Sequence, residues 1–117
     1  MKEKLFEILQ TFGAPIYLQG TLAENADYPG EFITYITTDS ETAAAYDNDE
    51  AATAWAFQIA YYSNDPAKVD SAQKKIRATL KAAGFIPQGR GYDLPSDRAD
   101  FTGWVCDYYY LENEGVL

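Results

Sequence analysis

The stretch AWAFQIAYYSNDPAKVDSAQKKIRATLKAAGF, residues 54–85, decides the fold. Its first part is a strand pattern in which the large side chains fall on every second residue. These residues are Trp55, Phe57, Ile59 and Tyr61. The opposite face carries mainly alanine and glutamine, which suits contact with water, a partner subunit or a closely packed neighbour. This alternation predicts a strand with one side packed against a helix layer.

The second part of the stretch is the pattern of an amphipathic helix. Asp65 is suited to cap the helix, and Pro66 to fill its first position, where a missing N–H costs nothing. Apolar residues then recur at helical spacing, and Gly84 ends the helix. The apolar positions are Val69, Ala72, Ile76, Leu80 and Ala83.

Weaker patterns on both sides predict the remaining elements. A helix is expected over residues 2–12, and strands over residues 16–18, 32–37 and 102–111. Residues 88–97 are rich in glycine, proline and polar groups, so an irregular or hairpin-like segment is expected there. Both faces of the last strand are partly apolar, which favours a central place in the sheet or cover by another subunit. This order predicts an α+β fold, a mainly antiparallel sheet with two helices on one face, as a single domain over residues 1–117.

An acidic segment separates the second and third predicted strands. Residues 39–50 contain five carboxylates and no basic residue, so a long, exposed connection is expected, with at most a turn of helix at its alanines. The carboxylates belong to Asp39, Glu41, Asp47, Asp49 and Glu50. They lack the alternate spacing, central glycine and distant glutamate of an EF-hand, so a solvated loop is favoured over a calcium or magnesium site.

The reactive residues give little sign of catalysis. The chain has no histidine, which excludes imidazole metal ligands and Ser-His or Cys-His nucleophiles. Cys106 lies in a strand pattern, where a packed thiol is favoured over an activated nucleophile. Residues 88–91 resemble a fragment of a phosphate loop without its full fingerprint, so a turn is favoured over anion binding by Arg90. We therefore expect a protein that is not an enzyme and that has no cofactor.

The charge balance limits the ligands. Nine basic and 18 acidic residues give a net charge of −9, which disfavours tight binding of nucleic acid. No apolar run approaches the roughly 20 residues that span a bilayer, and the amino terminus lacks the apolar core of a secretory signal. The single cysteine suits a reducing cytosol.

Aromatic residues point instead to protein contacts. The chain has ten tyrosines and two tryptophans, and such side chains are enriched in interfaces. Neighbouring tyrosines in the strands cannot all point inward, so some must face outward. The candidate interface aromatics are Tyr46, Tyr62 and Tyr109.

Several short motifs, spread over nearly the whole chain, resemble the small tail-terminator or tail-completion proteins of long-tailed bacteriophages and prophages. They are Tyr28-Pro29 before Phe32-Ile33-Thr34-Tyr35, Ala45-Tyr46-Asp47-Asn48, the aromatic strand to Tyr62, Gly84-Phe85 at the helix end, and Asp107-Tyr108-Tyr109-Tyr110.

The resemblance implies an α+β subunit without catalytic residues that forms a ring, usually a hexamer, on the tail tube. The ring would stop tube growth and offer a surface to the head connector, so the expected partners are copies of itself, the tail-tube protein and the connector. The expected location is the virion neck, after assembly in the bacterial cytoplasm. The acidic segment at residues 39–50 is then expected to face the lumen or a neighbouring ring, where negative charge keeps DNA from adhering.

Three alternatives remain open from the sequence. The chain could be another neck component, such as a head–tail connector or a minor tail protein. It could be a monomeric inhibitor or binding domain whose acidic surface mimics DNA. The third alternative is a metal-assisted enzyme that uses the acidic segment.

Overall fold

The computed structural model describes residues 2–18, 30–46, 49–95 and 101–113. Its elements, in chain order, are α1 (Lys2–Gln10), β1 (Ile16–Leu18), β2 (Glu31–Tyr46), β3 (Asp49–Ser63), α2 (Pro66–Ala82), β4 (Ile86–Pro95) and β5 (Thr102–Asn113). The strands form one sheet in the order β1-β2-β3-β5-β4. Among the described strands, only β1 and β2 pair in parallel, and the other neighbours are antiparallel. The predicted α+β fold is confirmed.

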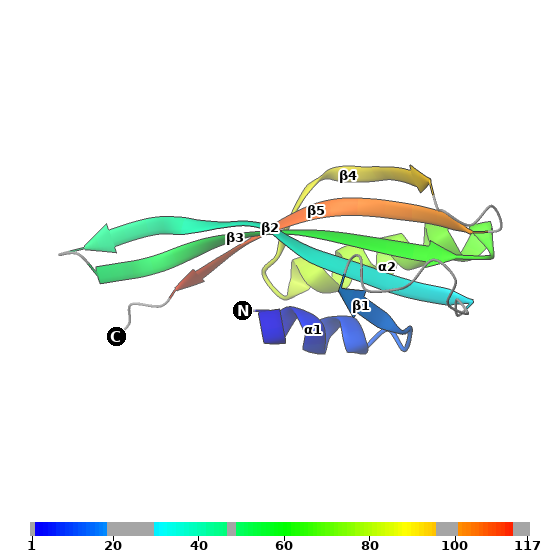
Figure 1. Ribbon diagram of the computed structural model, residues 1–117, viewed down its shortest axis with the longest axis horizontal. Helices are drawn as coiled ribbons and strands as arrows, with labels where there is room; N and C mark the ends of the chain where they lie inside the picture. Colours follow the sequence, from blue (N-terminus) through cyan, green and yellow to red (C-terminus); the bar gives the residue numbers. More distant parts are fainter. Residues whose placement is uncertain (1, 19–29, 47–48, 96–100, 114–117) are drawn as a thin grey trace.

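Both helices lie on one face of the sheet (Figure 1), and the main hydrophobic core fills the space between the helices and the sheet. The face predicted for β3 is the one that packs here, since Phe57, Ile59 and Tyr61 are 0%, 3% and 5% exposed. Helix α1 contributes Leu5 and Leu9, which are fully buried. The other buried members include Ile33, Val69, Ile76, Leu80, Phe85, Cys106 and Tyr108.

Helix α2 begins and ends as its sequence predicts. The Asp65 side chain accepts a hydrogen bond from the backbone N–H of Ala67 at 3.1 Å, and Pro66 follows as the first helical residue. At the other end, Gly84 has a φ of +99° and Phe85 N–H donates to the Leu80 carbonyl at 2.9 Å. This bond closes the helix by the reversal that glycine permits.

The segment expected to be an acidic loop is instead part of a long hairpin. Strand β2 continues to Tyr46 and β3 begins at Asp49, and these two residues are opposite each other in the ladder. The expected connection and the turn of helix at the alanines were therefore wrong. We call residues 39–46 of β2 and 49–56 of β3 the arm, which projects beyond both helices (Figure 1). The arm accounts for the elongated shape of the molecule, 53 × 27 × 22 Å.

The five acidic candidates are thus assigned differently from the prediction. Asp39 and Glu41 lie in β2, Asp49 and Glu50 lie in β3, and Asp47 is outside the described residues. The sequence obscured these strands because alanine, aspartate and glutamate have low strand propensity. Register shifts near residues 37–39 and 42–45 also interrupt the alternation by which a strand is recognised.

The glycine-rich segment predicted to be irregular or hairpin-like forms most of β4, an edge strand that pairs with β5. A bulge between Gln88 and Tyr92 interrupts the ladder, where Gly89 and Gly91 have φ values of +71° and +88°. A Cβ at Gly91 would lie 2.5 Å from the Val105 carbonyl oxygen, so no other residue fits without a shift. The indole N–H of Trp104 donates to the Arg90 carbonyl at 3.1 Å across this bulge. These contacts explain the glycines as features of the strand. Strand β5 lies inside the sheet, between β3 and β4, which is the first of the two arrangements that its apolar faces predicted.

Candidate interaction surface

On each side of the arm, the sheet has an open strand edge. Strand β1 pairs only with residues 33–35 of β2, so within the described residues the outer edge of β2 from Ile36 to Tyr46 has no strand partner. On the other side, the last pair between β4 and β5 is Ile86 with Tyr109, and β5 continues to Asn113. Exposed edges are templates for pairing with another chain, although the bulges in β2 limit how long such a ladder can be.

The arm becomes thinner toward its tip. Strand β5 follows β3 as far as the pair of Asn113 with Ala52, and beyond this pair only β2 and β3 continue together. A two-stranded hairpin is marginally stable in water without further packing. Among the described side chains of the arm, Trp55 at its base packs against the main core, and the two strands then project beyond the helices (Figure 1). The tip is therefore the part of the sheet that gains most from contact with another molecule.

A groove of about 340 Å³ lies where the arm joins the rest of the sheet, on the face opposite the helices. Its apolar side chains are unusually exposed: Ile86 is 57%, Tyr109 50% and Leu111 52% accessible. Ile86 and Tyr109 are opposite each other in the ladder between β4 and β5. Asp39 and Asp107 also line the groove. The surface is thus an apolar patch with two carboxylates.

The three aromatic interface candidates differ in their surroundings. Tyr109 lies in the groove and is half exposed, which suits contact with a partner. The ring of Tyr62 stacks on Phe32, with centroids 4.9 Å apart, and is only partly exposed. Tyr46 is the last residue of β2. Of the three, only Tyr109 joins a described groove, and Ile86 and Leu111 beside it were not predicted as interface residues.

The sequence held a signal for these two missed residues. Leu111 lies two residues after Tyr109, so the alternation in the sequence already places both on one face of the strand. Ile86 comes immediately before Pro87 in a segment whose pairing was not predicted. Its place beside Tyr109 depends on the register of β4, which the bulge at residues 88–92 sets.

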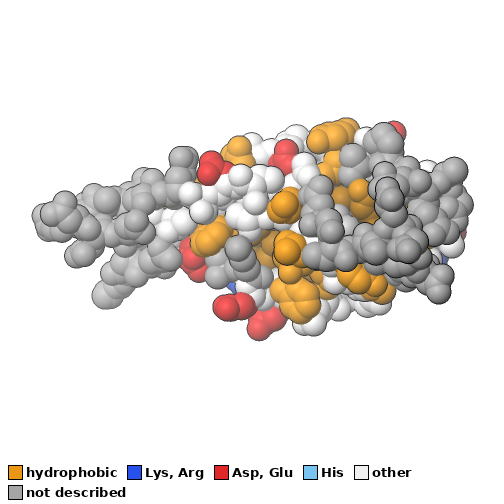
Figure 2. All heavy atoms as spheres, viewed as in Figure 1, with side chains coloured by type: hydrophobic (Ala, Val, Ile, Leu, Met, Phe, Trp, Pro, Cys, Tyr) orange, Lys and Arg blue, Asp and Glu red, His pale blue; other side chains and the backbone are white. Residues whose placement is uncertain are grey.

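Charge is unevenly distributed between α2 and the rest of the chain. Helix α2 contains five basic residues and one acidic residue, a net charge of +4. Because the whole chain carries −9, the remainder carries −13. Figure 2 shows acidic side chains and very little basic surface on the face it presents, including the region where the arm begins.

The buried titratable groups are those of a packed core. Cys106 is 5% exposed, and burial raises the pKa of its thiol, so the thiolate nucleophile is disfavoured at neutral pH. Burial also raises the pKa of Tyr108 and of Tyr61, whose hydroxyl donates a 2.6 Å hydrogen bond to the Glu31 carboxylate. The predicted packing of Cys106 is confirmed.

The described residues contain neither a cluster that could hold a metal ion nor a helix that could span a membrane. No group of three or more cysteine, aspartate or glutamate side chains there has the geometry to hold a metal ion. None of the helices in that part of the chain is long and apolar enough to span a membrane.

Comparison with protein-family models found no match, and neither did comparison with curated proteins.

Proposed function

We propose that this chain is a structural subunit of a phage or prophage neck, a tail-terminator or related minor tail protein that assembles into a ring. The ring caps the tail tube and joins it to the head. The sequence resemblance implies that it is a hexamer. The observation that carries the proposal is the arm, a projecting hairpin where the sheet has an open edge on each side, with an exposed apolar groove at its base. These features suit a protein that is completed by its neighbours.

A ring follows from contacts between different surfaces of identical subunits. When one surface of a subunit binds a different surface of the next, the assembly closes if the rotation between subunits is suitable. The arm and its groove provide one such surface. Helix α2 provides a different one, on the opposite face of the sheet and of opposite net charge.

The acidic arm also suits a passage for DNA. Glu41, Asp49 and Glu50 belong to the two arm strands, which project beyond α2 (Figure 1). We place these carboxylates at the lumen or against a neighbouring ring, where they repel phosphates. The chain then guides DNA without binding it.

Electron microscopy of the purified protein, alone and with tail tubes from the same virus, tests the proposal. We expect annuli with a central hole, or caps at the tube ends if the ring closes only there. A protein that remains a monomer under both conditions and leaves the tubes bare would contradict it. In that case, inhibition of a DNA-binding protein would support the acidic mimic instead.

The role of the arm carboxylates is tested by exchange of Asp49 and Glu50 for lysine. We expect assembled particles with reduced DNA delivery, measured as infectivity per particle. The matched pair is Asp49→Lys alone and Asp93→Lys on β4, which each reverse one charge, inside and outside the arm. Equal infectivity of the two variants of this pair would remove the proposed role from Asp49.

A further inference from the structure

The groove and α2 complement each other in charge and in shape. The groove presents Asp39 and Asp107 beside three exposed apolar side chains, Ile86, Tyr109 and Leu111. Helix α2 presents exposed lysines, among them Lys68, Lys74 and Lys75. Within one molecule the two surfaces lie on opposite faces of the sheet, so they cannot meet.

The outward face of α2 is suited to a close approach. Its apolar positions Val69, Ile76 and Leu80 are buried against the sheet, which leaves the other face available. Small residues alternate with lysines there: Ala67, Ser71, Lys74, Ala78 and Lys81 are all exposed. Alanines let a helix axis come near an apolar surface, and the flanking lysine stems can cover that surface while their charged ends reach carboxylates.

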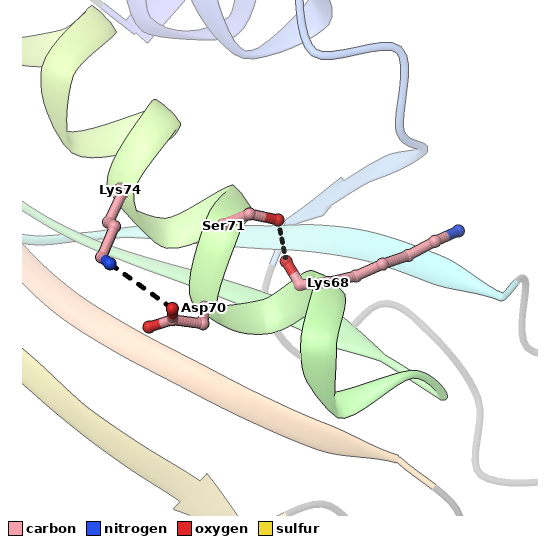
Figure 3. A network of polar contacts seen from close by, with 4 residues as sticks. All are labelled: Lys68, Asp70, Ser71 and Lys74. Carbon is pink, nitrogen blue, oxygen red and sulfur yellow. Dashed lines mark hydrogen bonds and ion pairs between the residues drawn. The ribbon is translucent and has the colours of Figure 1, made fainter.

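The contacts that these lysines make within the chain are weak. The Lys75 amine lies 6.0 Å from the centroid of the Phe12 ring, at the long end of the range for a cation–π contact. Lys74 pairs with Asp70 at 3.4 Å, but both side chains are more than two-thirds exposed, and such a pair contributes little (Figure 3). Ser71 donates to the backbone carbonyl of Lys68, whose side chain extends away from the helix (Figure 3). Exchange of these contacts for a partner's carboxylates would therefore cost little.

We infer that the groove of one copy receives the outward face of α2 of the next copy, with Lys74 and Lys75 directed at Asp39 and Asp107. This inference rests on the proposed function, because it supplies the contact between neighbours in the ring. The contact joins two different surfaces, so it propagates from copy to copy. It assigns Asp39 to the subunit interface and leaves the carboxylates nearer the arm tip to the lumen or to a neighbouring ring.

A zero-length carbodiimide cross-linker, which joins lysine amines to carboxylates in contact, tests the inference directly. Equal amounts of ordinary and heavy-isotope protein are mixed at assembling concentration, cross-linked and analysed by mass spectrometry. We expect mixed-isotope links from Lys74 or Lys75 to Asp39 or Asp107. Rings whose mixed-isotope links join only other residues would overturn this contact while leaving the ring intact. A chain that forms neither annuli nor tube caps would overturn both proposals.

Charge exchange gives a second, independent test. A groove variant with Asp39→Lys and Asp107→Lys, and a helix variant with Lys74→Glu and Lys75→Glu, should each associate about tenfold more weakly than the native chain. Mixing the two variants should restore assembly, because the reversed groove of one then faces the reversed helix of the other. Sedimentation velocity measures this recovery, and Asp93→Lys serves as the control with unchanged association.

Two provisions keep this test decisive. Asp107 accepts a 3.4 Å hydrogen bond from Gln58, so Asp39→Lys alone replaces the double variant if the latter melts early. Failure of the mixed variants to recover, with each of them folded, would overturn the inference. Binding of α2 to added DNA, lost with Lys74→Glu and without any link between copies, would overturn it in favour of a nucleic-acid contact.

Discussion

The body of the molecule, where α1 and α2 cover the sheet, differs sharply from the arm. In the body, Phe57 and Leu80 have no accessible surface, and the two helices and three strands bury each other. Around the base of the arm, Tyr109 and Leu111 of the same sheet are half exposed, and toward the tip the ladder narrows to two strands. The body therefore contains the buried contacts that stabilise the single chain, whereas the arm presents open strand edges and exposed apolar side chains that a second molecule could cover.

The largest effect expected from this difference is on two leucines. Leu80→Ala leaves a cavity in the body and should lower the free energy of unfolding by about 3 kcal/mol, measured by urea denaturation of the monomer. Leu111→Ala removes a half-exposed side chain and should change it by less than about 0.5 kcal/mol. Similar losses at both sites would show that the groove supports the folded monomer.

A somewhat smaller effect is expected at the bulge of β4. Gly91→Ala places a Cβ against the Val105 carbonyl and forces a strained positive φ, so it should cost about 2 to 3 kcal/mol. Gly89→Ala is the matched control. It has the same strain of a positive φ, but no atom lies within 4 Å of the added Cβ, so it should cost about 1 kcal/mol. Equal melting temperatures for the two variants would mean that the close approach at Gly91 does not constrain the strand.

A pH-dependent effect is expected at Tyr61. Its pKa is raised above the ordinary value of 10.0, first by burial and then by the hydrogen bond to Glu31. As pH rises, Tyr61 therefore loses its hydroxyl proton in the unfolded state before it does so in the folded state. The contribution of Tyr61 to the stability of the folded state is complete below pH 10 and is lost as pH rises above that value. In that range each such proton contributes about 1.4 kcal/mol per pH unit to the slope of the unfolding free energy.

Tyr61→Phe tests this effect by removing the hydroxyl. The variant should lose part of the alkaline slope, and the slope that remains belongs to Tyr108, whose pKa burial also raises. Denaturation series from pH 8 to 11.5 measure the change. An unchanged slope in the variant would show that Tyr61 ionises equally easily in the folded and unfolded protein.

The body could be predicted from the sequence, and the arm could not, for a physical reason. In β3 the alternation of Phe57 and Ile59 is enforced by burial on one face, and in α2 the cap at Asp65 and the stop at Gly84 are local. Such signals survive without knowledge of the rest of the fold. Of the described arm side chains, only Trp55 packs against the core under the helices. Further along the arm, the sequence lacks the alternating apolar face that burial enforces in the body, and its alanines and carboxylates resemble a loop.

The interaction surface was predictable only in part. Tyr109 was expected to be a contact residue because consecutive tyrosines in β5 cannot all point inward. The groove around it required the register of β4, which depends on the unpredicted bulge, and so Ile86 was missed. The acidic residues were recognised from the composition of the segment. That they lie on two paired strands was not predicted.

Hydrogen exchange of the protein, dilute and assembled, most directly tests whether the arm is completed by neighbouring copies. The amides of β3 in the body, from Phe57 to Tyr62, should be strongly protected in both states because they lie in the centre of the sheet. The paired amides of residues 42–46 in the arm should exchange rapidly in the dilute monomer and become protected on assembly. Arm amides that are protected equally in both states would contradict a partner-dependent arm.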